Sequence, residues 1–208
     1  MNEEPGVTFQ IIAGEPSVDF VNTLDNRPVP ERRTELLTSY QALTDWAAQA
    51  GMINPRWCLR LLRAAETHPR EASAVLAQAI QVRECLYRIF ASILARRRPA
   101  ESDLAALNQQ LGKAASHLRL KSAGKSFRLD WEEEENPPLE SVLWPIARSA
   151  SDLLISGDLG HLRECGARTC RWMFVDRSKN HSRRWCDMKV CGNRVKVRKF
   201  YRRKRQAR

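Results

Sequence analysis

The sequence lacks a long hydrophobic run. No stretch of its 208 residues approaches the roughly 18 consecutive apolar residues that cross a bilayer as a helix. The first ten residues, MNEEPGVTFQ, are acidic and lack the basic and apolar segments of a secretory signal. These absences predict a cytoplasmic protein with no membrane partner, in which the six cysteines are mostly reduced.

Short motifs of common catalytic chemistry are also missing. The sequence contains no glycine-rich phosphate loop, no metal-ligating helix motif and no Ser/His/Asp or Cys/His pairing. His68 and His117 are isolated in the sequence. We therefore expect a binding protein and no enzyme. An enzyme in the N-terminal part, with the C-terminal part as its anchor, is the less favoured alternative.

Acidic residues are scarce in the last quarter of the chain. Residues 161–208 contain 17 Lys and Arg but three acidic residues, a net charge of +14. Residues 1–160 contain 18 basic and 21 acidic residues, a net charge of −3. This asymmetry predicts two modules, over 1–158 and 159–208, and indicates that the second one meets a polyanion.

The first module has mainly helical periodicity. Asn54-Pro55 has the form of an N-cap followed by proline at the first helical position, and Pro145 predicts a break in the last helical pattern. The expected helices cover residues 36–50, 55–67, 69–98, 102–111 and 139–153. Alternating apolar residues in HLRLKSAGKSFRLDWE predict a small β-hairpin. The expected fold is mainly α.

Four cysteines form two close pairs in the basic segment: Cys165, Cys170, Cys186 and Cys191. Each pair has the form C-x4-C, and fifteen residues separate the pairs. Such spacing is typical of one structural zinc ion held tetrahedrally. His161 or His181 in place of one cysteine, two disulfides, or buried free thiols are the alternatives. Cys58 and Cys85 stand in helical patterns, where core packing is the simplest role.

The basic segment is predicted to form a treble-clef-like zinc finger. RWMFVD is expected to be a strand, RSKN a turn and HSRRWC the returning strand, followed by a helix over 191–205. Cys191 then lies near the first turn of the helix, whose N-terminus favours a thiolate. A module of about 48 residues with few aliphatic side chains depends on the metal to fold.

The same residues resemble a known family, the CGNR zinc finger. The tetrapeptide is Cys191 to Arg194, and the rest of the pattern is Asp176, Ser178, Asn180, Arg184, Trp185, Cys186 and Met188. Upstream, VDFVNTLDNR and LLTSYQALTDWAAQAG are similar to the start of the ABATE domain. The resemblance implies a bacterial-type, stress-induced transcription regulator. Its finger would bind DNA, and its helical domain would sense a ligand or mediate contacts.

The predicted C-terminal helix carries a stripe of arginines. We assign Lys199, Arg202, Arg203, Lys204 and Arg205 to phosphates, and Arg194 and Arg198 to base edges, because arginine pairs bidentately with guanine. Bracing of the zinc knuckle is an equal alternative for Arg194. Lys196, Arg183 and Arg184 extend the surface. RNA is the alternative partner. Val197, Phe200 and Tyr201 are expected to pack on the finger.

Two polar residues, Asp19 and Asn22, stand among apolar ones in SVDFVNT. They are candidates for a ligand pocket that binds an unidentified small-molecule effector. Hydrogen bonding to the local backbone is the simpler role. The sequence is also compatible with a homodimer.

Overall fold

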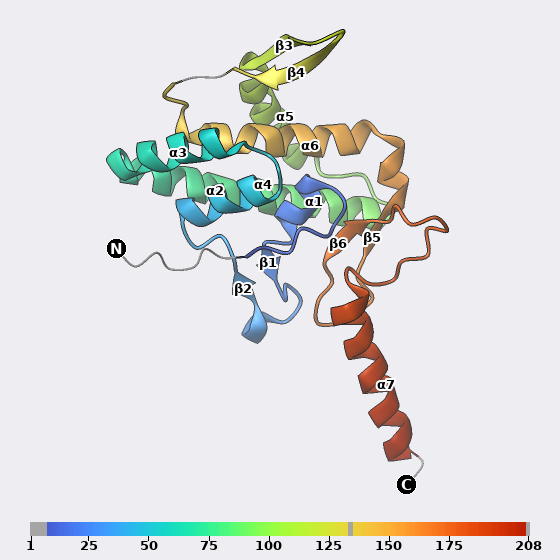
Figure 1. Ribbon diagram of the computed structural model, residues 1–208. Coiled ribbons are helices and arrows are strands. Elements are labelled where there is room, and N and C mark those ends of the chain that lie inside the picture. The colour runs from blue at the N-terminus through green and yellow to red at the C-terminus, as the bar shows by residue number, and fades with distance from the viewer. Residues whose placement is uncertain (1–7, 133–134, 207–208) are drawn as a thin grey trace.

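Helices dominate the computed structural model, which describes residues 8–132 and 135–206 (Figure 1). The helices are α1 (Pro16–Val21), α2 (Tyr40–Gln49), α3 (Pro55–Thr67), α4 (Pro69–Leu94), α5 (Glu101–Ser116), α6 (Trp144–Ile155) and α7 (Asn193–Gln206). Three antiparallel strand pairs join β1 (Leu24–Asp25) to β2 (Thr34–Glu35), β3 (Leu118–Ala123) to β4 (Ser126–Trp131), and β5 (Leu162–Glu164) to β6 (Met173–Val175). The prediction of a mainly α fold with a small hairpin and a C-terminal finger is confirmed.

The long helix α4 is the centre of the fold. It packs against α1, α2, α3 and α5. Its neighbours begin where capping residues predict, because the Ser39 side chain accepts a hydrogen bond from the Ala42 amide at the start of α2, and Asn54 accepts one from Trp57 at the start of α3. No helix among the described residues is long and apolar enough to cross a membrane.

Two helix boundaries are set by the backbone. α4 ends at Leu94, earlier than the predicted 98, because Arg96 adopts a left-handed conformation with φ of 55°. The predicted break at Pro145 is confirmed. A 3-10 turn over Leu139–Leu143 leads into α6, and proline occupies the first turn of that helix, where its missing amide costs no hydrogen bond.

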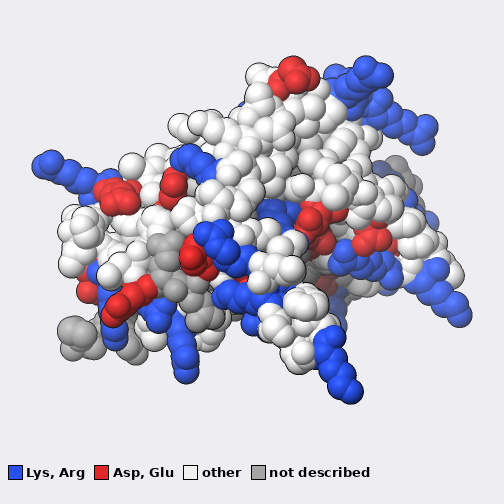
Figure 2. All heavy atoms as spheres, turned by 90° about the horizontal axis from the view of Figure 1, so that it is seen from above, with Lys and Arg blue, Asp and Glu red and all other residues white. Residues whose placement is uncertain are grey.

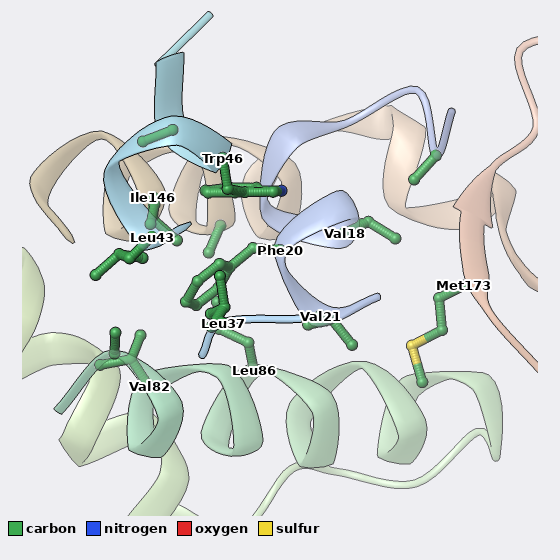
Figure 3. Packing of buried hydrophobic residues seen from close by; sticks show 14 of the residues in the cluster. Val18, Phe20, Val21, Leu37, Leu43, Trp46, Val82, Leu86, Ile146 and Met173 are labelled. Carbon is green, nitrogen blue, oxygen red and sulfur yellow. The ribbon is translucent and has the colours of Figure 1, made fainter. Parts of the chain in front are cut away.

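The hydrophobic core extends from the helical part into the finger. Phe20 of α1 and Trp46 of α2 pack with ring centroids 4.9 Å apart, above Leu86 of α4 (Figure 3). Met173 of β6 points toward the same layer and is 1% exposed, and Phe174 is fully buried. The finger's second strand is therefore part of the main core, and its side chains contribute to the stability of the whole chain.

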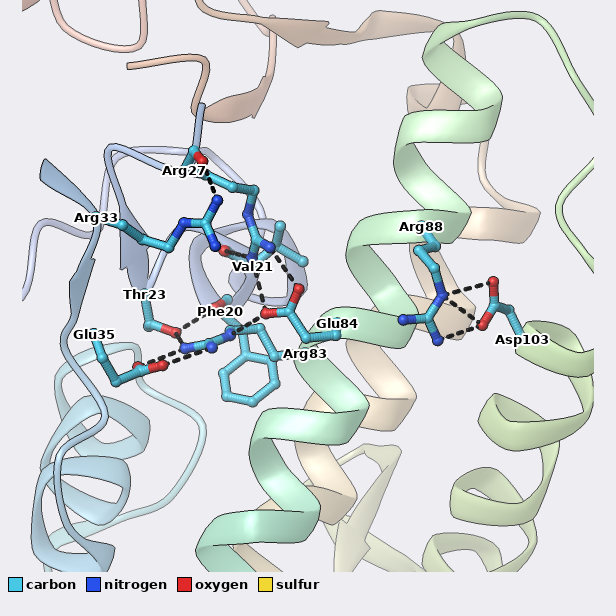
Figure 4. Close-up of polar contacts among 10 residues, drawn as sticks. All are labelled: Phe20, Val21, Thr23, Arg27, Arg33, Glu35, Arg83, Glu84, Arg88 and Asp103. Carbon is cyan, nitrogen blue, oxygen red and sulfur yellow. Dashed lines mark hydrogen bonds and ion pairs between the residues drawn. The ribbon is translucent and has the colours of Figure 1, made fainter. Parts of the chain in front are cut away.

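A buried arginine joins α4 to the segment around β1 and β2. Arg83 is 2% exposed, and its guanidinium contacts Glu35 at 2.6 and 2.7 Å and Glu84 at 3.0 Å (Figure 4). Arg27 contacts the other oxygen of Glu84 at 2.5 Å and lies over the Tyr87 ring. Because a buried guanidinium without its carboxylate is costly, these pairs fix the position of the loop after α1.

The hairpin of the finger differs from the prediction. The strand over Met173–Val175 pairs with Leu162–Glu164, which precedes the first cysteine pair, and the expected returning strand in HSRRWC is absent from the described structure. The prediction was wrong because 162–164 is too short to show an alternating pattern. The zinc knuckle therefore lies inside the β5–β6 hairpin, and residues 177–187 form an irregular loop that leads to α7.

Candidate metal centre and nucleic-acid interface

The four predicted cysteines converge on one point. Their sulfur atoms all lie within 4.8 Å of one another, and each of the four is buried. The Sγ atoms of Cys170 and Cys186 are 3.6 Å apart, and those of Cys186 and Cys191 are 3.7 Å apart. Tetrahedral Zn–S bonds of about 2.3 Å require sulfurs about 3.8 Å apart. The donor set fits one structural zinc ion, as predicted.

Backbone contacts shape the loop that holds the first pair. The Cys165 amide donates to the carbonyl of Trp172 at 2.8 Å, which continues the β5–β6 ladder to the metal site. Gly166 donates to the carbonyl of Arg184 at 2.9 Å, and a Cβ at Gly166 would lie 3.3 Å from that oxygen. The first cysteine loop is thus tied directly to the segment that carries the second pair.

A capped turn places the last ligand at the start of α7. One Asp187 oxygen accepts hydrogen bonds from the amides of Lys189 and Val190, at 2.5 and 3.2 Å. A π-helical turn over Met188–Gly192 then runs into α7. A Cβ at Gly192 would lie 2.4 Å from the Met188 sulfur, so any larger residue at this position of the CGNR motif would displace the Met188 side chain. The sequence showed the motif but gave no indication of the Met188 contact.

Asp176 organises the loop between the cysteine pairs. Its carboxylate accepts from the amide and hydroxyl of Ser178 and, at 2.8 Å, from the amide of Arg183. Burial raises the pKa of Asp176, but these hydrogen bonds outweigh burial, so the pKa lies below its usual value. The residue therefore acts as a local hydrogen-bond acceptor, the role expected of a turn aspartate.

The two histidines of the finger stack on each other. The rings of His161 and His181 are parallel, with centroids 3.8 Å apart, and Nδ1 of His181 lies 2.8 Å from the carbonyl of Asp176. The group of metal-binding side chains found among the described residues consists of the four cysteines and includes neither ring. The geometry therefore favours the four-cysteine set over the alternative with histidine.

The helix α7 extends away from the rest of the molecule (Figure 1). Among its 14 residues, eight are Lys or Arg and none is acidic. Within the described part of the chain, none of these eight forms an ion pair. They are the predicted residues Arg194, Lys196, Arg198, Lys199, Arg202, Arg203, Lys204 and Arg205. By contrast, basic and acidic side chains are interspersed on the face shown in Figure 2.

The apolar residues of α7 are exposed. Val197, Phe200 and Tyr201 are 53%, 63% and 59% exposed, so the expectation that they pack on the finger was wrong. Phe200 and Tyr201 instead contact each other edge to face, with centroids 5.6 Å apart. The periodicity was helical, as predicted, but a stripe of three side chains does not show whether a partner surface lies beside it.

The two other predicted contact arginines, Arg183 and Arg184, and Arg194 at the start of α7 have different surroundings. Arg183 donates to the carbonyls of Trp185, Ile12 and Cys186, and its guanidinium lies over the Phe174 ring. These contacts favour a structural role for Arg183. Arg184 is exposed beside the Trp185 ring. Arg194, in the first turn of α7, lines a cavity of about 270 Å³ together with Cys170, Cys186 and Cys191.

The candidate pocket residues bind backbone instead of lining that cavity. Asp19 accepts from the amides of Ile12 and Ala13, both at 2.9 Å, and burial raises its pKa from 3.8 to about 6. Asn22 donates to the carbonyl of Met173 and accepts from its amide, at 2.9 and 3.0 Å. A ligand-binding role for either residue stays a prediction.

Contacts between the helical part and the finger were missed by sequence reasoning. The indole of Trp172 donates to Asp25 at 2.9 Å, and Arg177 contacts Glu15 at 3.1 Å and Asp158 at 2.8 Å. Arg177 also donates to the carbonyl of Gly14. The polar residues of VDFVNTLD were a signal of this junction, since short buried polar groups need partners.

The fold and site define a helical module joined to a four-cysteine zinc finger with a basic C-terminal helix. Residues 14–157 match the family model described as "Putative stress-induced transcription regulator" (ABATE), and residues 161–204 match the CGNR zinc finger. The chain belongs to the ABATE family and contains a CGNR finger, as the sequence resemblance predicted. No curated protein matches the chain.

Proposed function

We propose that this zinc-binding protein regulates transcription by binding DNA through α7. The observation that carries the proposal is a helix with eight basic and no acidic residues, extending from a metal-anchored turn (Figure 1). The positive side chains of such a helix repel one another, and binding to phosphates removes this repulsion. From the family resemblance we further propose a bacterial, cytoplasmic protein, and DNA binding would associate it with the nucleoid.

The zinc site has an anchoring role in this proposal. Cys191 is buried in the turn from which α7 begins, and the other three ligands come from the β5–β6 hairpin and the loop after it. The metal therefore fixes the direction of α7 relative to the helical module. Arg198 faces solvent and is the candidate for base contacts, whereas Arg194, beside the cysteines, is equally suited to bracing the site.

The variant Arg202→Ala/Arg205→Ala tests the role of α7. Loss of two phosphate contacts should weaken duplex DNA binding roughly tenfold or more near 0.1 M salt, as measured by fluorescence anisotropy. Arg63→Ala/Arg70→Ala is the matched control, because it removes the same charge near the α3–α4 junction, at the opposite end of the molecule from α7 (Figure 1). Equal loss in both variants would contradict the proposal.

Single-stranded RNA is a second candidate partner, favoured by one observation. Phe200 and Tyr201 are exposed among basic residues, and aromatic rings of this kind stack on unpaired bases. Phe200→Gln/Tyr201→Gln should then cost about 1–3 kcal/mol per stacked base for single strands and little for duplex DNA. Direct competition between duplex DNA and single-stranded RNA at equal salt decides between the two partners.

The helical module is proposed to sense a ligand or to mediate contacts. We propose that this module comprises residues 1–158 and the finger residues 159–208. The two family matches, over 14–157 and 161–204, fall on either side of this boundary. The cavity beside the cysteines supports a sensing role, because Asp25 and Asn26 from the helical module line it together with Arg194 of α7. A thermal-shift screen of small molecules, repeated on Asn26→Ala, would test this role.

A further inference from the structure

The β3–β4 hairpin leaves an apolar face uncovered. Leu120, Phe127 and Leu129 are 67%, 72% and 51% exposed, although they alternate regularly along the two strands. The hairpin lies at the edge of the molecule and forms a sheet of two strands (Figure 1). An exposed apolar face beside an unpaired strand edge is a site of association in proteins.

The free edge of β4 has its hydrogen-bonding groups in a defined register. Ala123 and Ser126 flank a two-residue turn, so they form a hydrogen-bonded pair, and the pattern alternates from there. Residues 126, 128 and 130 direct their backbone groups toward β3. The amides and carbonyls of Phe127 and Leu129 therefore face away from β3 and are available to another strand.

We propose that two copies of this chain pair through β4, antiparallel and centred on Leu129. In this register Leu129 lies opposite its own copy, and Phe127 lies opposite Trp131 of the second copy. Within each chain the Trp131 amide donates to Asp130 and the Trp131 carbonyl accepts from Lys121. The Phe127 amide would therefore share that carbonyl, which has two lone pairs. Phe127, Leu129 and Trp131 share one face of the extended sheet, so the pairing would bring the apolar side chains of both β4 strands into lateral contact and bury part of their exposed surface. The result is a four-stranded sheet, which is more stable than an isolated hairpin.

Charge complementarity favours a second copy of the chain as the partner that pairs with β4. The proposed register places Arg128 opposite Asp130 of the second copy, and twofold symmetry makes this pair twice. Within one chain these two side chains already attract each other at 3.0 Å. The equivalent pairing of β3 around Leu120 would place Arg119 opposite Lys121, which is repulsive. The edge of β4, and not that of β3, is therefore the self-complementary edge.

Charge reversal provides the test of this dimer. Full-length, reduced, zinc-loaded protein should sediment as a dimer at about 100 µM, well above the roughly micromolar Kd of a small interface. Arg128→Asp and Asp130→Arg each create two like-charge pairs and should weaken the dimer about tenfold. The double variant Arg128→Asp/Asp130→Arg restores opposite charges and should regain the dimer. Arg70→Asp, at an exposed position in the first turn of α4, is the matched control.

Three results would overturn the proposal. They are a monomeric wild type at that concentration, single variants as dimeric as the wild type, and a folded double variant as weak as the singles. Hydrogen exchange of the wild type gives an answer without any variant. The amides of Phe127 and Leu129 should exchange more slowly at about 100 µM than at about 1 µM, and concentration-independent exchange there would equally exclude the β4 dimer.

Discussion

At the scale of single residues, the CGNR motif is explained by packing as much as by metal binding. Cys191 supplies a ligand, Gly192 leaves room for the Met188 side chain, and Asn193 donates to the carbonyl of Lys189 at 2.9 Å. Asn193 and Arg194 are both exposed, and Arg194 lines the cavity beside the cysteines. The main role of the tetrapeptide is thus structural, because it forms the turn that connects the metal site to α7.

Gly192→Ala should destabilise the zinc-loaded protein by about 1 kcal/mol, because the added Cβ displaces the flexible Met188 side chain. In a Met188→Ala background the same change should be nearly neutral. Thermal unfolding of the four proteins measures the coupling. Gly157→Ala, where a Cβ meets nothing within 4 Å, is the control. An equal cost of Gly192→Ala in both backgrounds would exclude the Met188 explanation.

Asp19 gives the stability of the protein a pH dependence. Burial raises its pKa from 3.8 to about 6 in the folded protein, so the folded state binds more protons than the unfolded state between these values. Ionised Asp19 therefore costs stability, and this cost appears as the pH rises from about 4 to above 6.

Asp19→Asn keeps an oxygen for the amides of Ile12 and Ala13 but cannot ionise. Its stability relative to the wild type should rise with pH across this window. Urea unfolding of both proteins at several pH values measures the difference in stability. Because both proteins contain the same zinc site, the pH dependence of that site cancels from the difference. Parallel pH profiles of the two proteins would show that Asp19 is not the titrating group.

At the scale of elements, the sequence predicted correctly those features that depend on residues close together in the chain. The Asn54-Pro55 cap, the hairpin around Gly124 and the start of α4 at Pro69 all follow from neighbouring residues, as do the four cysteines of the metal site. The pairing of β5 with β6 and the exposure of α7 depend on which distant surface lies beside an element. Three residues at 162–164 carry no periodicity from which that pairing could be predicted.

The turn that begins α7 should depend on Asp187. Asp187→Ala removes the acceptor for two amides and should cost about 1 kcal/mol, whereas Asp187→Asn, which keeps the acceptor, should recover most of it. Chemical unfolding and amide exchange at Val190 measure the effect. If Asp187→Asn were as unstable as Asp187→Ala, capping would not be the reason for an acidic residue at this position.

At the scale of the whole molecule, the finger is docked on the helical part. β6 contributes to the main core, and Asn22 exchanges two hydrogen bonds with the backbone of Met173. Asn22→Ala should therefore cost about 1–3 kcal/mol, because it leaves buried backbone groups unpaired. Calorimetry should show the single transition of the wild type at a lower temperature. Asn108→Ala, at an exposed position of α5, should leave it unchanged.

The central claim is that α7 binds DNA through its positive charge, and the salt dependence of binding tests it most directly. The logarithm of the affinity of the zinc-loaded chain for duplex DNA should fall linearly with the logarithm of salt concentration, by about 0.9 per phosphate contacted. Arg202→Ala/Arg205→Ala, which removes two proposed phosphate contacts, should reduce the slope by about 1.8. Binding that is insensitive to salt, or a slope that the two substitutions leave unchanged, would contradict the claim.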